Sequence, residues 1–107
     1  MTEAQIEEMI LQYLAYAGWW GIKVPTTGYH DGTGWRKQAS KWCINGFPDV
    51  LAMKEGKILF FEIKTPVGRQ SDAQKAFEKR LHEYGHNYFL VRSVEDVKKV
   101  INDLICG

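Results

Sequence analysis

Cysteines are few in this chain, and long hydrophobic runs are absent. Only two of the 107 residues are cysteines, and Cys43 and Cys106 fit no metal-binding spacing. We expect reduced thiols, and the sequence leaves a disulfide between them open. No apolar run approaches the ~20 residues that span a bilayer, and the amino terminus lacks a signal-peptide pattern. These features predict a cytoplasmic protein without membrane contact, built as one domain over residues 1–107.

A strong charge of one sign is also lacking. The formal net charge is +1, which gives no general argument for nucleic-acid binding. The local distribution is more informative, because residues 23–46 contain four basic side chains and one acidic one, together with two tryptophans, a tyrosine and a histidine. Such a mixture favours contact with phosphates and bases, and we expect it of Arg36, Lys37 and Lys41. The alternative is a solvated loop whose aromatic residues fold onto the core.

Hydrophobic periodicity and capping residues predict the order helix, three strands, helix, strand, helix, or αβββαβα. Capping-box spacing occurs at Thr2 with Gln5 and at Ser71 with Gln74. The final strand, helix and strand predict a crossover with parallel pairing. Residues 26–45 show no periodicity and predict a long functional loop. The expected elements are helices over 3–17, 71–84 and from 93, with strands over 19–24, 49–53, 58–63 and 87–92. The second helix should bury a stripe formed by Ala73, Phe77, Leu81 and Tyr84.

Charged residues interrupt two strands that otherwise have the composition of buried strands. The strand over 58–63 contains Glu62, and Lys64 follows on the same face because side chains alternate with a period of two. Asp49 opens the preceding strand, and antiparallel pairing predicts that its carboxylate lies close to that of Glu62. Adjacent carboxylates repel unless a cation lies between them, and oxygen ligands favour Mg²⁺ or Mn²⁺. A buried ion pair between Lys64 and one acid is the alternative.

The same residues resemble the signature of PD-(D/E)XK nucleases, which cut phosphodiester bonds with divalent metal. The signature is formed by Pro48 and Asp49, followed by Glu62 and Lys64. A longer set resembles the VRR-NUC (virus-type replication-repair nuclease) branch and extends over residues 3 to about 101. That set comprises Gly46 to Asp49, Phe61 to Pro66, Gly68, Arg69, Ser71 and Gln74. The resemblance implies a restriction-endonuclease-like α/β fold, with a mixed central sheet flanked by helices, in a bacterial or phage-infected host cell.

The resemblance also implies the roles of individual residues in a nuclease site. The metal ligands would be Asp49, Glu62 and the backbone carbonyl of Ile63; the catalytic residues would be Asp49, Glu62, Lys64 and Gln74; and Arg69 would join the residues that contact nucleic acid. Lys64 would orient a water molecule or stabilise the phosphate.

A metal-binding glutamate on the first helix is a further implication, because related junction-resolving nucleases carry one there. The family's Glu-x-x-Ile pattern selects Glu3, whereas spacing to the glycine that ends the helix favours Glu7. Both acids also suit the positive end of a helix dipole without any metal role. The sequence leaves the choice open.

These features together predict a Mg²⁺- or Mn²⁺-dependent deoxyribonuclease that prefers branched DNA, such as Holliday junctions, in replication or repair. A module that binds branched DNA without cutting it, or a nuclease acting on RNA or DNA flaps, is the alternative. We expect a two-fold homodimer, because one site cuts one strand and a symmetric junction presents two. Four tryptophans exceed what so small a core readily buries, so either Trp19 or Trp20 should face outward.

Overall fold

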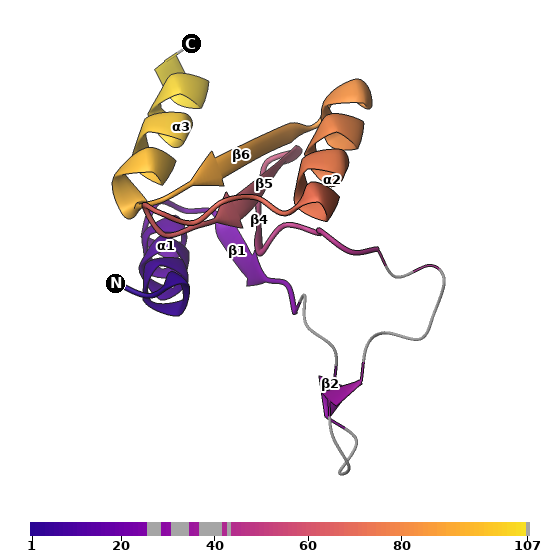
Figure 1. The fold of residues 1–107 in the computed structure, drawn as a ribbon. Coiled ribbons are helices and arrows are strands. Elements are labelled where there is room, and N and C mark those ends of the chain that lie inside the picture. The colour runs from indigo at the N-terminus through magenta and orange to yellow at the C-terminus, as the bar shows by residue number, and fades with distance from the viewer. Residues whose placement is uncertain (26–28, 31–34, 37–41, 43, 107) are drawn as a thin grey trace.

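The computed structural model describes residues 1–25, 29–30, 35–36, 42 and 44–106. A four-stranded sheet forms its centre, and helices pack on both sides of that sheet (Figure 1). In chain order the elements are α1 (Glu3–Tyr16), β1 (Trp20–Lys23), β2 (Tyr29–His30), β3 (Trp35–Arg36), β4 (Val50–Lys54), β5 (Lys57–Ile63), α2 (Asp72–Glu83), β6 (Asn87–Val91) and α3 (Val94–Cys106).

Both predicted capping boxes are present at helix amino termini. At α1 the backbone N–H of Gln5 donates to Thr2 Oγ1 at 3.2 Å, and the N–H of Thr2 donates to Gln5 Oε1 at 2.8 Å. Ser71 and Gln74 repeat the arrangement at α2. Each box satisfies backbone groups that a bare helix end leaves unpaired, so the starts of these helices follow from local sequence.

The central sheet has the strand order β1-β4-β5-β6. The pairs β1 with β4 and β4 with β5 are antiparallel, whereas β5 and β6 are parallel and are joined through α2. This arrangement confirms the predicted parallel crossover. It also confirms that the strand containing Glu62 is an inner strand, with a neighbour on each side.

The core lies between the sheet and the pair α1 and α3, which are side by side on one face (Figure 1). Phe61 and Ile63 of β5 enter this core, where Ile10 and Leu14 of α1 are fully buried. Because side chains alternate along a strand, the intervening Glu62 points to the other face, toward α2. The alternation of Phe61, Glu62 and Ile63 along β5 therefore places the carboxyl group of Glu62 on the α2 side of the sheet.

The segment predicted as a loop over 26–45 contains a short hairpin that periodicity did not indicate. Strands β2 and β3 pair antiparallel over two residues each and form a separate two-stranded sheet. Two-residue strands are too short to produce a recognisable alternation, which explains the difference. Lys37, Lys41 and Cys43 lie outside the described residues.

The predicted buried stripe of α2 is wrong at its last member. Leu81 is buried and Phe77 is half-buried, but Tyr84 is 64% exposed. The reason is that α2 packs on the sheet near β6, while Tyr84 lines an open groove beside Trp42 and Ile44. The paired tryptophans match expectation: Trp19 is 6% exposed and Trp20 is 67% exposed. Within the described part of the chain, no helix is long and apolar enough to cross a membrane.

Candidate active site

Asp49 and Glu62 meet on neighbouring strands, as predicted. Val50 of β4 pairs with Phe61 of β5, so one step beyond this pair Asp49 stands opposite Glu62 in an antiparallel register. The carboxylate of Asp49 is held by the backbone, because its Oδ2 accepts a hydrogen bond from the N–H of Ile63 at 2.9 Å. Asp49 therefore lies just before β4, rather than as its first residue, and its side chain bridges to the end of β5.

The carboxyl group of Glu62 is buried and strongly perturbed. Its side chain is 0% exposed, and Glu62 is the one charged residue among the buried residues of the described chain. Burial raises the pKa of Glu62 from its ordinary 4.5 to about 9, and a hydrogen bond with Asp49 and the charge of Asp49 add to the effect. The nearby Lys64 acts in the opposite direction. At neutral pH the carboxyl group of Glu62 consequently keeps its proton.

Gln74 connects the first turn of α2 to this pair. Its Oε1 accepts from the N–H of Ser71 at 2.8 Å, which completes the helix cap, and its Nε2 donates to Glu62 Oε2 at 2.9 Å. One side chain therefore fixes the start of the helix and orients Glu62. The sequence predicted the cap, and the resemblance placed Gln74 among the active-site residues; in the structure one amide both caps the helix and binds Glu62.

Gly46 brings the segment before Asp49 into close contact with the same turn of α2. Its φ is +86°, and a Cβ built on it would lie 2.4 Å from the carbonyl oxygen of Ala73 and 2.8 Å from the backbone nitrogen of Gln74. Only glycine fits this conformation and this spacing. The glycine at the start of the Gly46 to Asp49 motif thus has a packing role: it seats the strand entry against the helix that carries Gln74.

Tyr88 is a site residue that the sequence analysis missed. It is buried on β6, its hydroxyl donates to Glu62 Oε1 at 3.5 Å, and Gln70 Nε2 donates to the tyrosine oxygen at 3.1 Å. Gln70 also donates to Glu78 Oε1 at 3.1 Å. Burial and the charge of Glu62 raise the pKa of Tyr88, so it stays a neutral donor. A tyrosine in an otherwise apolar strand was the available signal, because a buried phenol needs a partner.

The two helix-one glutamates occupy different electrostatic positions. Glu7 Oε2 lies 3.3 Å from Lys23 Nζ, which forms an ion pair. Glu3 is exposed at the first turn of α1, and its charge contributes to the raised pKa of Glu62. Glu7 thus has a cationic partner of its own, and the charge of Glu3 is the smallest of the effects on the pKa of Glu62.

The turn after β5 holds Lys64 at the edge of the site. The N–H of Lys64 donates to the carbonyl of Val91 at 3.0 Å, which extends the pairing of β5 with β6 by one residue. Arg92 Nη1 donates to the carbonyls of Thr65 at 2.6 Å and Gly68 at 2.7 Å, so the following turn is fixed by a side chain from the end of β6. Arg69 follows this turn and is exposed.

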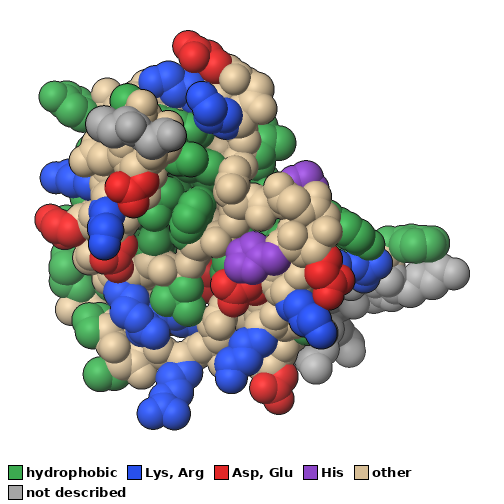
Figure 2. Space-filling view, turned by 90° about the horizontal axis from the view of Figure 1, so that it is seen from above, with side chains coloured by type: hydrophobic (Ala, Val, Ile, Leu, Met, Phe, Trp, Pro, Cys, Tyr) green, Lys and Arg blue, Asp and Glu red, His purple; other side chains and the backbone are tan. Residues whose placement is uncertain are grey.

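Basic side chains do not gather into one patch on the face shown in Figure 2, where Lys and Arg alternate with Asp and Glu. Of the residues predicted to contact nucleic acid, Arg69 lies shortly after Lys64, while Lys37, Lys41 and the side chain of Arg36 fall outside the described residues. The structure therefore brings together Asp49, Glu62, Lys64 and Gln74, with Arg69 a few residues away.

The acidic pair fits a divalent cation in part. A buried carboxyl group whose pKa is raised by an adjacent acid is a natural place for Mg²⁺ or Mn²⁺, because the ion can replace the proton of Glu62 and remove the repulsion. Nowhere in the described chain do three Asp, Glu, His or Cys side chains gather closely enough to hold a metal ion. Further ligands would have to come from the backbone of Ile63, from water, or from a repositioned Glu3.

This mixed sheet, with α1 and α3 on one face and α2 on the other, has the restriction-endonuclease-like α/β arrangement that the resemblance implied. One solved structure with this fold is described as a "VRR_NUC domain": it matches with a TM-score of 0.69 and 24% sequence identity over 95% of this chain and 97% of that chain. No protein-family model and no curated protein matches the sequence. The likeness confirms the predicted fold class.

Proposed function

We propose that this protein is a metal-dependent nuclease whose active centre is the pair Asp49 and Glu62 with Lys64. The observation that carries the proposal is the buried carboxyl of Glu62 beside a second acid on an inner strand. Burying one acid beside another is unfavourable for a purely structural protein, and a strongly perturbed carboxyl group is typical of a functional site. The fold shared with a structure described as a "VRR_NUC domain" supports the same interpretation.

Each residue of the centre has a role that follows from its position. Asp49 and Glu62 would hold the ion, with the carbonyl of Ile63 as a further ligand. A bound Mg²⁺ or Mn²⁺ would neutralise charge at the phosphate and make a bound water more acidic. Lys64 presents an ammonium group beside the acids, where it stabilises the negative charge that builds on the phosphate or orients the attacking water. Gln74 and Tyr88 keep Glu62 in place.

We further propose that the substrate is DNA with a branched structure and that the protein acts as a homodimer. One centre of this kind cuts one strand, and a two-fold dimer presents two equivalent centres to the two strands of a symmetric junction. The outward-facing Trp20 on the edge strand β1 offers apolar surface for such contacts. A module that binds branched DNA without cutting it, and a nuclease acting on RNA or on flaps, remain the competing functions.

A cleavage panel tests the proposal. Labelled linear, nicked, flapped and four-way DNA, with an RNA hairpin, is incubated with the protein in Mg²⁺, in Mn²⁺ and in EDTA. We expect metal-dependent cutting of the four-way or flapped DNA. The variants Asp49→Asn, Glu62→Gln and Lys64→Met each preserve side-chain size and should reduce the rate by about 100-fold or more, as loss of a charge-stabilising group does.

The matched control is Asp72→Asn, an exposed acid at the start of α2, which should keep wild-type activity. Binding to four-way DNA without cutting under any metal would favour the non-cleaving module, and cutting of the RNA alone would reassign the substrate. Cutting that persists at the wild-type rate in any of the three active-site variants means the centre lies elsewhere. Sedimentation of the free protein should give twice the 12.3 kDa chain mass; a clean monomer contradicts the dimer.

A further inference from the structure

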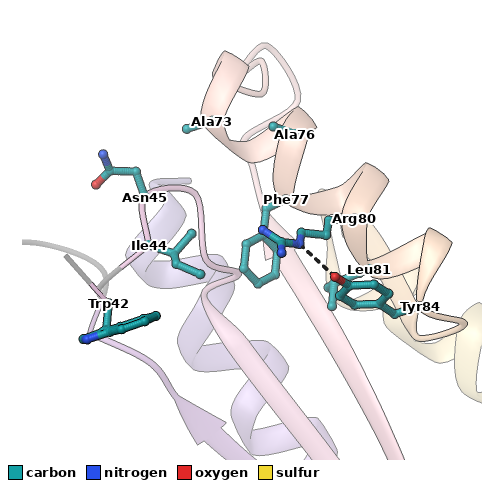
Figure 3. Close-up of a pocket in the computed structure, with 9 residues that line it drawn as sticks. All are labelled: Trp42, Ile44, Asn45, Ala73, Ala76, Phe77, Arg80, Leu81 and Tyr84. Atoms are coloured by element: carbon teal, nitrogen blue, oxygen red, sulfur yellow. Dashed lines mark hydrogen bonds between the residues drawn. The ribbon is translucent and has the colours of Figure 1, made fainter.

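An apolar groove lies between α2 and the segment that leads into Asp49. Its volume is about 800 Å³, which is within the range of sites that bind small ligands. Figure 3 shows Trp42, Ile44 and Asn45 on one side and one face of α2 on the other. The lining residues are Trp42, Ile44, Asn45, Ala73, Ala76, Phe77, Arg80, Leu81 and Tyr84.

Aromatic side chains dominate the open part of the groove. Trp42 is 80% exposed on one wall and Tyr84 is 64% exposed on the other, and Phe77 lies between them (Figure 3). Phe77 is held firmly, since its ring is 5.0 Å from that of Phe47, which in turn is 6.3 Å from the ring of Phe60 on β5. A chain of packed rings therefore connects the floor of the groove to the central sheet. Exposed aromatic surface of this kind commonly marks a binding site.

The charge of the groove is positive. Arg80 is the one ionisable side chain other than Tyr84 among its lining residues. Its guanidinium lies over the ring of Tyr84, with the carbon 5.7 Å from the ring centroid, and its Nε donates to the hydroxyl of Tyr84 at 3.3 Å. Flat aromatic faces beside a cation match the two parts of a nucleotide, because the base stacks on the ring and the phosphate approaches the guanidinium.

The groove adjoins the proposed active centre through both of its walls. The α2 wall begins at Ala73, next to Gln74, whose side chain binds Glu62. The opposite wall continues from Asn45 into Gly46, which packs on that same turn of α2, and reaches Asp49 three residues later. A strand whose phosphate lies at the acidic pair thus has this groove next to it.

We propose that the groove binds unpaired bases of the substrate strand by stacking, beside the scissile phosphate. The inference rests on the proposed nuclease function for its choice of ligand, and it specifies the substrate as nucleic acid with a single-stranded stretch at the cut. Stacking tolerates any base because every base has a flat face. Bases within an intact duplex are already stacked and are therefore unable to enter.

A second copy of this chain fits the groove less well. A two-fold interface places the same patch on both subunits, so it would bring two Arg80 guanidinium groups together. The groove offers no carboxylate among its lining residues to offset that repulsion. A polyanion removes the same difficulty, since its phosphates supply the missing negative charge.

Binding without metal tests the groove separately from cleavage. Fluorescence anisotropy in EDTA compares a labelled single strand with the same strand in which the central bases are replaced by abasic sites. Tyr84→Leu and Trp42→Leu should each weaken binding of the ordinary strand by about fivefold or more, the loss of one stacked base, and should leave binding of the abasic strand unchanged. Arg80→Gln should lower the salt dependence on both strands by about 0.7 in slope.

The control is Tyr16→Leu, which removes an exposed aromatic residue outside the groove, and it should bind as the wild type does. Equal losses on the two strands, or no loss on either, would overturn the stacking proposal. A change from dimer to monomer on sedimentation of Tyr84→Leu would overturn it in favour of a second copy. Because Tyr84 is exposed, that variant decides the matter even where Trp42→Leu fails to fold.

The outcome for the groove and the outcome for the nuclease are distinguishable. If the wild-type protein binds the ordinary strand more tightly than the abasic strand but cuts no substrate, the stacking proposal stands and the proposed nuclease function is wrong. If the wild-type protein cuts DNA in the presence of metal but the groove variants bind both strands as the wild type does, the proposed nuclease function stands and the stacking proposal is wrong.

Discussion

Replacing Glu62 by glutamine should stabilise the metal-free protein, and the gain should grow with pH. The native carboxyl keeps its proton up to about pH 9, whereas the ordinary value is 4.5. Between these two pH values the native state binds a proton that the unfolded state has released, so the free energy of unfolding falls as pH rises. The contribution of Glu62 to the free energy of unfolding is therefore greatest below pH 4.5, the ordinary pKa, and lowest above about pH 9.

The size of the effect follows from the pKa difference. At about pH 8 the raised pKa of Glu62 corresponds to at most about 5 kcal/mol of lost stability. Relaxation of the site and entry of water reduce the cost of burying a charge, so we expect about 2 kcal/mol, or about 10 °C in Tm for a chain of this length. An amide keeps an acceptor for Gln74 and gains a donor for Asp49, and it gives up only the longer 3.5 Å bond from the Tyr88 hydroxyl, so the packing and most of the hydrogen bonding survive the change.

Thermal and urea unfolding in EDTA at about pH 5, 6.5 and 8 would measure this difference. Glu55→Gln, at an exposed turn position, is the control and should show no growing gap. Millimolar Mg²⁺ at about pH 8 should raise the Tm of the wild type and leave that of Glu62→Gln nearly unchanged, because the ion can replace the proton of Glu62 only where two carboxyl groups remain. A gap that is absent or independent of pH would refute the assigned protonation.

Two further predictions concern the segments on either side of the site. Gly46→Ala should cost at least about 2 kcal/mol more than Gly56→Ala, because both glycines have positive φ but only the first would place a Cβ against α2; chemical denaturation of the two variants measures the difference, and equal costs would contradict the close packing. Replacing Arg36, Lys37 and Lys41 together should weaken DNA binding and lower its salt dependence by about 0.9 in slope for each phosphate that the variant no longer neutralises; an unchanged slope in a salt titration would exclude the loop from the interface.

The sheet and its acidic pair were predictable because the information is local. Pro48 before Asp49, the turn containing Gly56, and alternation along residues 58–63 together set the register of a single hairpin. Once that register is set, Asp49 and Glu62 have to face each other. The capping boxes are equally local, since each depends on two residues three positions apart.

Contacts that depend on the packing of distant elements were not predictable. Tyr88 reaches Glu62 only because β6 returns parallel to β5 after α2, and a parallel crossover does not fix register from sequence. The choice between Glu3 and Glu7 likewise depends on the angle at which α1 meets the sheet. Helical spacing gave both residues comparable status, and in the structure Glu7 forms an ion pair with Lys23 of β1.

The groove escaped the sequence analysis for a related reason. A helix stripe at the correct spacing predicts burial, and Tyr84 was assigned to the core on that basis. Helical spacing shows which residues lie on one face of the helix, but it does not show how much of that face the sheet covers. On α2 the sheet supports the middle of the stripe, while beyond it the face meets the segment around Trp42 and Ile44 and stays partly open. When the apolar face of a helix extends beyond the sheet that covers it, the uncovered part is a candidate binding site.

The buried Glu62 and the exposed aromatic residues of the groove both differ from what is usual in a stable small domain. The hydrophobic effect favours a buried Tyr84 and an exposed Glu62. In this structure Tyr84 is exposed and Glu62 is buried, and α2 contacts both places. Glu62 has hydrogen bonds from Gln74 and Tyr88, which make its position specific without removing the cost of ionising it. Local conflicts of this kind persist where a ligand resolves them, and a nucleic-acid strand with its metal ion would resolve both, since the ion neutralises the acids and the bases cover the rings.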